Sequence, residues 1–328
     1  MKERIECPIC NSIETSFFCN LDEEYLITSD SGWKHDKELM KLSGFDTDKD
    51  IECSYYRCSD CKAYYIKQIY DMEIGFQAFY KKHPEIYEKG FINRNKNRTK
   101  SFVVRAQSIM RALELAIERS KGQEINVLDY GCGGAFDLSI MRAVQTKKAV
   151  GYNPYSYPFD VAKKYIQNDI LLLDNIDDVK KHGPYDFIRC NGVLEHVNDP
   201  VDSLKKIYSL LSESGVVYFS APNSTDTLMA KFKKQVLQKE KVKILHPGHL
   251  QIWNLNGMCL SKFVQKNGFK VIPFRSRPKF NDITEIKNVT KLTSNLILLI
   301  VITFYDFFMA LIGQFKRSDF VATKNKAK

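Results

Sequence analysis

The chain has 328 residues, a hydrophobic share of 44% and a formal net charge of +10 at pH 7. This length allows one large domain with additional segments. The hydrophobic share is high enough for a sizeable core, which excludes a chain that stays unfolded because it is too polar. The positive charge favours anionic partners or a lysine-rich solvated surface, but no basic run is interleaved with aromatic residues, so a nucleic-acid partner is not expected.

Six of the nine cysteines lie in the first 61 residues, in a pattern that suits a metal ion. Cys7 and Cys10 form one C-x-x-C pair, and Cys58 and Cys61 form a second. Each pair can present two thiolates to one tetrahedral ion, and disulfides are not expected because no signal peptide precedes them. We therefore predict a structural zinc ion in a zinc-binding domain over residues 1–75. The segment between the pairs holds further candidate ligands, which we interpret as buried thiols or a surface side chain: Cys19, His35 and Cys53.

A helical linker is expected over residues 76–120. Within it, residues 101–119 carry apolar side chains at helical spacing. This helix either covers a ligand site as a lid or only packs on the main domain, and the pattern favours neither alternative.

A glycine-rich turn follows the apolar run that begins at Val127. Asp129 stands two residues before Gly131-Cys132-Gly133. A strand that turns sharply into a helix needs residues with free φ, and such a turn brings backbone N–H groups close to a ligand. A dinucleotide fingerprint would have a further glycine where this chain has phenylalanine.

Strands alternating with helical stretches then predict a parallel, doubly wound α/β sheet. Its last strand must return to lie beside the strand before it. Ligands of such sheets bind beyond the carboxyl ends of the strands. After the first strand, we expect strands at residues 149–152, 170–175, 186–190, 216–220, 268–272 and 318–324.

The glycine motif and a second signature at residues 185–197 together resemble the class I S-adenosylmethionine-dependent methyltransferases. The resemblance implies a Rossmann-like sheet of seven strands over residues 121–284 and 317–328, with S-adenosylmethionine as cofactor. The family usually has an acid where this chain has Asn153, whose amide can accept a hydrogen bond but carries no charge. The cofactor-binding residues implied are Asp129, Gly131, Cys132, Gly133, Asn153, Asp174, Asn175 and Asn191.

A zinc-binding segment followed by such a domain resembles bacterial enzymes that modify sugars. We predict methyl transfer to a saccharide, either a sugar nucleotide or a lipid-linked glycan, in surface-polysaccharide biosynthesis. The alternatives are a quinone-type or other small-molecule O-methyltransferase, and a non-catalytic binding protein that keeps the fold. A hydroxyl acceptor reacts better when a base takes its proton. His196, with Glu195 beside it, and His249 are the candidate catalytic residues, although the Glu-His pair would equally shape a cofactor pocket.

Residues 296–312 are almost wholly apolar, but the run is short for a membrane span and contains Asp306. We predict an apolar amphipathic helical segment over residues 285–316, inserted before the last strand, that contacts the membrane surface through residues 292–316. An oligomer interface, or packing on its own domain, is the alternative. The expected location is cytoplasmic, peripheral at the cytoplasmic membrane face.

Overall fold

The computed structural model describes ten parts of the chain. The predicted apolar segment at residues 285–316 lies outside the described residues. Among the helices that are described, none combines the length and the apolar character needed to cross a membrane. The described parts are residues 2–21, 36–44, 53–69, 71–85, 88, 99–144, 146–221, 249–253, 260–272 and 320–325.

The main domain is built on a seven-stranded sheet, as the sequence predicted. The strands lie in the order β12-β13-β10-β9-β6-β7-β8, and β13 runs antiparallel to both of its neighbours while the pairs from β10 to β8 are parallel. The return of the last strand to a place beside its predecessor is thereby confirmed. The strands are β6 (Ile125–Tyr130), β7 (Thr146–Tyr152), β8 (Leu171–Leu173), β9 (Tyr185–Asn191), β10 (Leu211–Ser220), β12 (Phe269–Ile272) and β13 (Phe320–Lys324).

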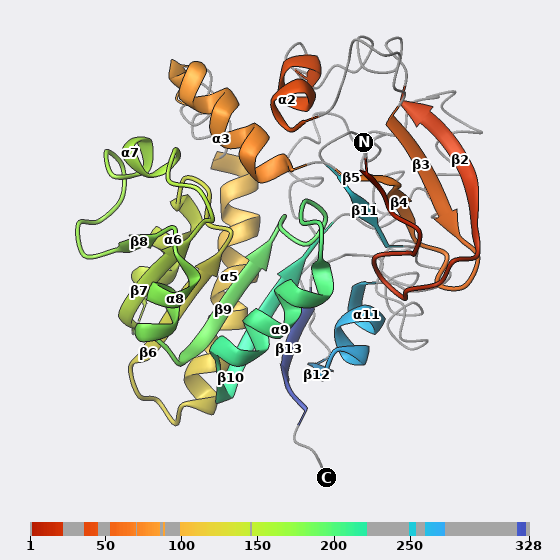
Figure 1. The fold of residues 1–328 in the computed structure, drawn as a ribbon. Coiled ribbons are helices and arrows are strands. Elements are labelled where there is room, and N and C mark those ends of the chain that lie inside the picture. Colours follow the sequence, from red (N-terminus) through yellow and green to blue (C-terminus); the bar gives the residue numbers. More distant parts are fainter. Residues whose placement is uncertain are drawn as a thin grey trace, which may run out of the picture.

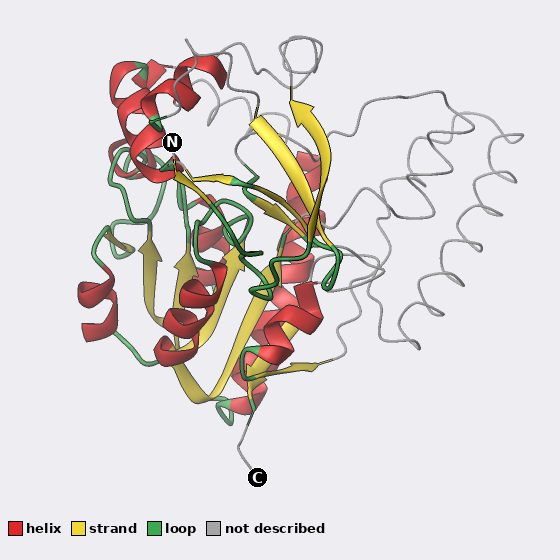
Figure 2. Ribbon diagram, turned by 45° about the vertical axis from the view of Figure 1, so that its right-hand side comes forward, coloured by secondary structure: helices red, strands yellow, loops and turns green. Residues whose placement is uncertain are grey.

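Helices cover both faces of this sheet because successive strand residues point to opposite sides. Val127 packs with one set of helices, and its neighbour Leu128 belongs to the cluster on the other face. The first set is α5 (Thr99–Arg119), α6 (Phe136–Arg142) and α7 (Phe159–Ala162). The second set is α8 (Ile176–Lys181), α9 (Pro200–Leu210) and α11 (Leu260–Lys266), as Figures 1 and 2 show.

The N-terminal part forms a smaller module, which we call the cysteine module and define as the described residues from 2 to 69. Its four-stranded sheet has the order β11-β4-β3-β2, and β11 (Gln251–Ile252) comes from far along the chain. The module's own elements are β1 (Lys2–Glu3), β2 (Thr15–Leu21), α2 (Asp36–Leu42), β3 (Cys53–Cys58), β4 (Tyr64–Ile66) and β5 (Gln68–Ile69). The helix α3 (Met72–Lys82) follows and contacts α2.

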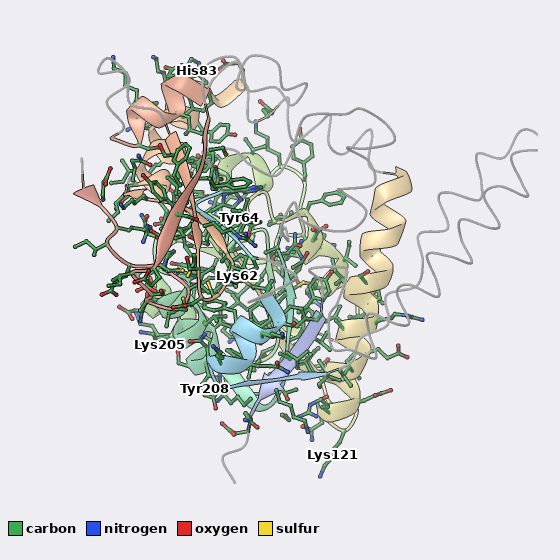
Figure 3. The ribbon with its side chains drawn as sticks, turned by 90° about the vertical axis from the view of Figure 1, so that its right-hand side faces the viewer. Lys62, Tyr64, His83, Lys121, Lys205 and Tyr208 are labelled. Atoms are coloured by element: carbon green, nitrogen blue, oxygen red, sulfur yellow. The ribbon has the colours of Figure 1, made fainter. Side chains whose placement is uncertain are left out.

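The cysteine module and α3 lie beyond the arrowheads of the parallel strands, so they face the edge where ligands bind in sheets of this kind (Figures 1 and 2). From the side, Lys62 and Tyr64 of the module are seen above Lys205 and Tyr208 of α9 (Figure 3). The module also shares a core with the domain, because its cysteines belong to the same buried cluster as Leu128 and Trp253.

Candidate functional site

The glycine turn between β6 and α6 is shaped by close contacts on one side and open space on the other. Gly131 has a φ of 81°, and a Cβ placed there would lie 2.2 Å from Cγ2 of Val193. Gly133 has a φ of 51°, and a Cβ there would meet no described atom within 4 Å. Ala135, at the third glycine position of the motif, is also left-handed with a φ of 55°. The turn therefore packs tightly on the segment after β9, while none of the described atoms crowds Gly133.

The acid of the motif is buried beneath this turn. Asp129 lies opposite Arg189 of β9 in the sheet register, and its Oδ1 is 2.7 Å from Nη1 of that guanidinium. The other arm of Arg189 reaches Oδ2 of Asp137, in the first turn of α6, at 2.5 Å. Burial raises the pKa of Asp129 even beside this cation. The ion cluster of Asp129, Arg189 and Asp137 links β6, β9 and α6. Asp129 therefore stabilises the strand end from which the glycine turn begins.

Arg189 and Asp137 were not among the residues singled out from the sequence. The sequence signal was a charged side chain within the apolar run of β9, because a buried charge needs a partner. Cys132 lies between the two glycines and is buried, with its Sγ 2.9 Å from the position of a Cβ on Gly151. Its backbone N–H, like that of Gly131, donates to the carbonyl oxygen of Tyr152.

Asn153 follows β7 and closes the turn from the side. Its Oδ1 accepts a hydrogen bond of 3.4 Å from the backbone N–H of Gly133, and the residue is only 2% exposed. Its Nδ2 is buried and has no hydrogen-bond partner among the described residues. A buried donor without a partner costs free energy, so this atom fits a ligand that brings an acceptor oxygen.

The remaining predicted cofactor residues lie at the same edge of the sheet. Asp174 is exposed just after β8, and the side-chain oxygen of Asn175 accepts from the N–H of Asp177 at 2.8 Å, which caps α8. Asn191 ends β9, is half-buried and pairs in register with Ser220 of β10. The structure thus brings the predicted positions to one edge, although the Asn175 oxygen already serves its own helix.

The three predicted catalytic residues come together in one cluster, although His249 is far from the others in the sequence. The Nε2 of His196 lies 3.9 Å from Oε1 of Glu195, and the rings of His196 and His249 are 5.0 Å apart. The Glu195 carboxyl is buried, and burial raises its pKa to about 8. Ligand atoms of the three residues lie within 4.8 Å of one another, so the cluster could hold a proton on an imidazole or bind a divalent metal ion.

The four predicted zinc ligands also converge. The sulfur atoms of Cys7 and Cys61 are 3.6 Å apart and those of Cys10 and Cys58 are 3.5 Å apart, which is too far for disulfide bonds. Four sulfurs at about 2.3 Å from a tetrahedral zinc ion would be about 3.8 Å apart, so the arrangement fits such an ion closely. The hydrogen bond between the sulfur atoms of Cys7 and Cys61 lowers the pKa of Cys7 to about 6, against the effect of burial. A thiolate is the form that binds metal.

Comparisons with known proteins identify the family of the main domain. A family model described as a methyltransferase domain matches residues 103–273, slightly more than half of the chain. The ubiquinone biosynthesis O-methyltransferase of Actinobacillus pleuropneumoniae serotype 7 (strain AP76) is 31% identical over 146 residues, and the match covers 39% of this chain and 62% of that protein. The mitochondrial ubiquinone biosynthesis O-methyltransferase of Saccharomyces cerevisiae is 30% identical over 177 residues, and the match covers 51% of this chain and 54% of that protein.

The chain therefore spans roughly half to three fifths of the length of these curated relatives. Among solved structures, the plantazolicin methyltransferase BamL in complex with a triazolic desmethylPZN analogue and SAH is similar, with a TM-score of 0.45 and 17% identity. That likeness covers 77% of this chain and 96% of BamL.

Proposed function

The chain belongs to the methyltransferase-domain family, and from this premise we propose that it is an S-adenosylmethionine-dependent methyltransferase that acts on an oxygen atom of a small-molecule acceptor. One observation carries the proposal. Gly131 of the cofactor turn packs directly against Val193, which stands two residues before Glu195 of the Glu195–His196–His249 cluster. A cofactor turn and a group of potential bases therefore adjoin at the ligand-binding edge of the sheet.

The residues around the turn fit the cofactor. No described atom crowds Gly133, so a ligand can lie against its backbone, and the Nδ2 of Asn153, which has no partner among the described residues, supplies a donor for a ribose hydroxyl oxygen. Asp174 and Asn191, at the ends of the neighbouring strands, complete the proposed binding surface. When bound, S-adenosylmethionine supplies a methyl group on a sulfonium sulfur that leaves as a neutral thioether.

The cluster suits removal of a proton from a hydroxyl group. Since the pKa of Glu195 is about 8, this carboxyl is mostly protonated at neutral pH and is a poor base there. The imidazoles of His196 and His249 have the right chemistry to accept the proton at that pH. We assign the base to one of these two rings and assign Glu195 a supporting place behind them.

The curated relatives support the alternative acceptor of the sequence analysis, a quinone-type or other small molecule, over the predicted saccharide. The relatives described above are named for O-methyl transfer in ubiquinone biosynthesis, whereas the predicted saccharide acceptor finds no support among them. We therefore propose a hydroxylated small molecule, such as a phenol. We also propose that Cys7, Cys10, Cys58 and Cys61 hold a structural zinc ion, because a closed set of four thiolates leaves no open position for catalysis.

The test begins with calorimetric titration of the protein with S-adenosylmethionine and S-adenosylhomocysteine. Gly131→Ala should abolish binding, because its Cβ would overlap Val193. Gly122→Ala is the matched control: its φ is 76°, but a Cβ there meets no described atom within 4 Å, and binding should be retained. Failure of the unchanged protein to bind at millimolar cofactor would refute the proposal.

The second stage measures methyl transfer to dihydroxyphenols and to sugar nucleotides. We expect turnover with phenols that falls at least about a hundredfold in whichever of His196→Asn and His249→Asn removes the base, with cofactor affinity unchanged. Lys205→Ala, an exposed change on α9, is the control and should keep full turnover. Turnover with sugar nucleotides alone would return the acceptor to the saccharide class.

A further inference from the structure

The segment that carries His249 is held in place by the cysteine module. The backbone of β11 pairs with β4, with Gln251 opposite Tyr65 and Ile252 opposite Tyr64. The N–H of Ile66 donates to the carbonyl oxygen of Leu250 at 2.9 Å. The hydroxyl of Tyr55, on β3, donates to the carbonyl oxygen of His249 itself at 2.5 Å. Hydrogen bonds from two strands of the module thus fix the backbone at and after His249.

The same segment is joined on its other side to the turn that carries Glu195 and His196. The N–H of Leu250 donates to the carbonyl oxygen of Glu195 at 2.6 Å. The side-chain amide of Gln251 donates to two carbonyl oxygens that flank the pair, those of Leu194 and of Val197, the second at 2.8 Å. These bonds connect His249 to the Glu195 turn through main-chain atoms, so the geometry of the cluster does not depend on its own side chains alone.

Gln251 is well suited to fix this geometry. Its residue is completely buried, so the carbonyl groups it serves have no easy access to water if the amide is lost. A second link joins the module to the same turn. The guanidinium of Arg4 donates to the backbone oxygen of Asn198 at 3.0 Å and to its side-chain oxygen at 2.7 Å. The turn that carries Glu195 is therefore bonded to Gln251 at Leu194 and Val197 and to Arg4 at Asn198, and neither of these two residues belongs to the seven-stranded sheet.

The metal-binding cysteines belong to this scaffold. Cys58 is the last residue of β3, the strand that also carries Tyr55, and its backbone N–H donates to Ala63 immediately before β4. Cys7 and Cys61 are buried in the same cluster as Trp253, which follows β11. An ion at the four sulfurs would cross-link the β3–β4 hairpin to the N-terminal loop and so hold the strand on which β11 pairs.

We propose that the cysteine module is a positioning element of the acceptor site. In this view its metal-loaded hairpin holds β11, and Gln251 transmits that constraint to the Glu195–His196–His249 cluster. The catalytic consequence of this positioning rests on the proposed function. The hold of the module on β11 is itself structural, and it can be measured without following methyl transfer. The module then fixes the position of the cluster, while the cofactor turn is held by β6, β7 and β9 and touches the cluster's segment through Gly131 and Val193.

The first experiment replaces Gln251 with Met, which is similar in length but lacks the amide donors. Gln265→Met, on the exposed side of α11, is the matched control. In the metal-loaded full chain we expect kcat for methyl transfer to fall about tenfold to a hundredfold, with a shifted pH profile and with the Kd for S-adenosylmethionine within about threefold. The control should change neither quantity. Unchanged kinetics and an unchanged pH profile in Gln251→Met would overturn the proposal.

The second experiment removes zinc from the full chain with a chelator, or by Cys58→Ser with Cys19→Ser as control, and measures amide hydrogen exchange. We expect the amides of Leu250 and Ile66 to lose at least about tenfold of their protection, while β6 and β7 keep theirs and cofactor still binds. Protection of Leu250 that survives complete metal loss would refute the role of the ion. If metal loss unfolds the whole chain, the exchange of Leu250 in metal-loaded Gln251→Met decides, and unchanged exchange there contradicts the proposal.

Discussion

The buried carboxyl of Glu195 should make the folding stability of the protein depend on pH, by an amount that follows from its raised pKa. Its residue is 2% exposed, and burial raises the pKa from 4.5 to about 8. Each unit of pKa is worth about 1.4 kcal/mol, so ionising this carboxyl costs the folded protein up to about 5 kcal/mol relative to the unfolded chain. Because the folded state binds the proton more tightly, this contribution to stability is complete below about pH 4.5 and is lost as the pH rises to 8.

Glu195→Gln keeps the shape of the side chain and removes the titration. We compare the free energy of unfolding of the unchanged protein with that of the variant. Their difference should fall by about 1.4 kcal/mol for each unit by which the pH rises between about pH 5 and 8. Urea denaturation at four pH values measures it, and Glu114→Gln, on the exposed side of α5, is the matched control. A difference that stays constant over this range would show that Glu195 is already ionised in the folded protein and would refute the reasoning.

Three further substitutions test the cofactor half of the site. Arg189→Met should destabilise the fold by about 3–5 kcal/mol in urea denaturation, because it leaves the buried Asp129 carboxylate without its cation; a loss below about 1 kcal/mol would contradict the ion cluster. Gly151→Ala should cost about 1–3 kcal/mol in the same assay, since its Cβ would lie 2.8 Å from Cδ2 of Leu172, and a neutral effect would mean that this contact relaxes freely. Asn153→Asp should tighten S-adenosylmethionine binding by about tenfold in calorimetry, because the carboxylate oxygen that replaces Nδ2 accepts from a ribose hydroxyl in a charge-assisted bond that is stronger than the one Nδ2 donates, and weaker binding would show that the ribose oxygen needs the Nδ2 donor.

Most of the sheet could be predicted because its strands are buried on both faces and therefore form apolar runs in the sequence. The strand ends were harder to predict, for identifiable reasons. β7 begins at Thr146, three residues earlier than expected, because its first, polar residues are already paired with β6 although part of them reaches solvent. β8 stops at Leu173 because Asn175 already caps the next helix. The apolar pattern thus locates the buried part of a strand, whereas backbone pairing and the cap of the following helix decide where the strand ends.

The site residues divide in the same way. Those of the glycine motif could be found because φ and close approach restrict which residues fit, and the restriction is local. Gln251 gave no such signal, since an isolated glutamine is usually a surface residue, and its role depends on two carbonyl oxygens more than 50 residues away in the sequence. His249 was identified as a candidate, but its contact with His196 depends on the pairing of β11 with β4, which no local pattern encodes.

The two halves of the site are consequently held by different parts of the molecule. The cofactor turn is fixed by neighbouring strands of one sheet and by the Arg189 ion cluster within it. The Glu195–His196–His249 cluster is fixed by bonds that run to β3, β4 and the N-terminal loop. A change in the cysteine module therefore acts first on the groups that face the acceptor, and it reaches the cofactor turn through the contact between Gly131 and Val193. On this reasoning, variation at residues 2–69 should alter acceptor use and proton transfer first, and cofactor affinity only when the common core is disrupted.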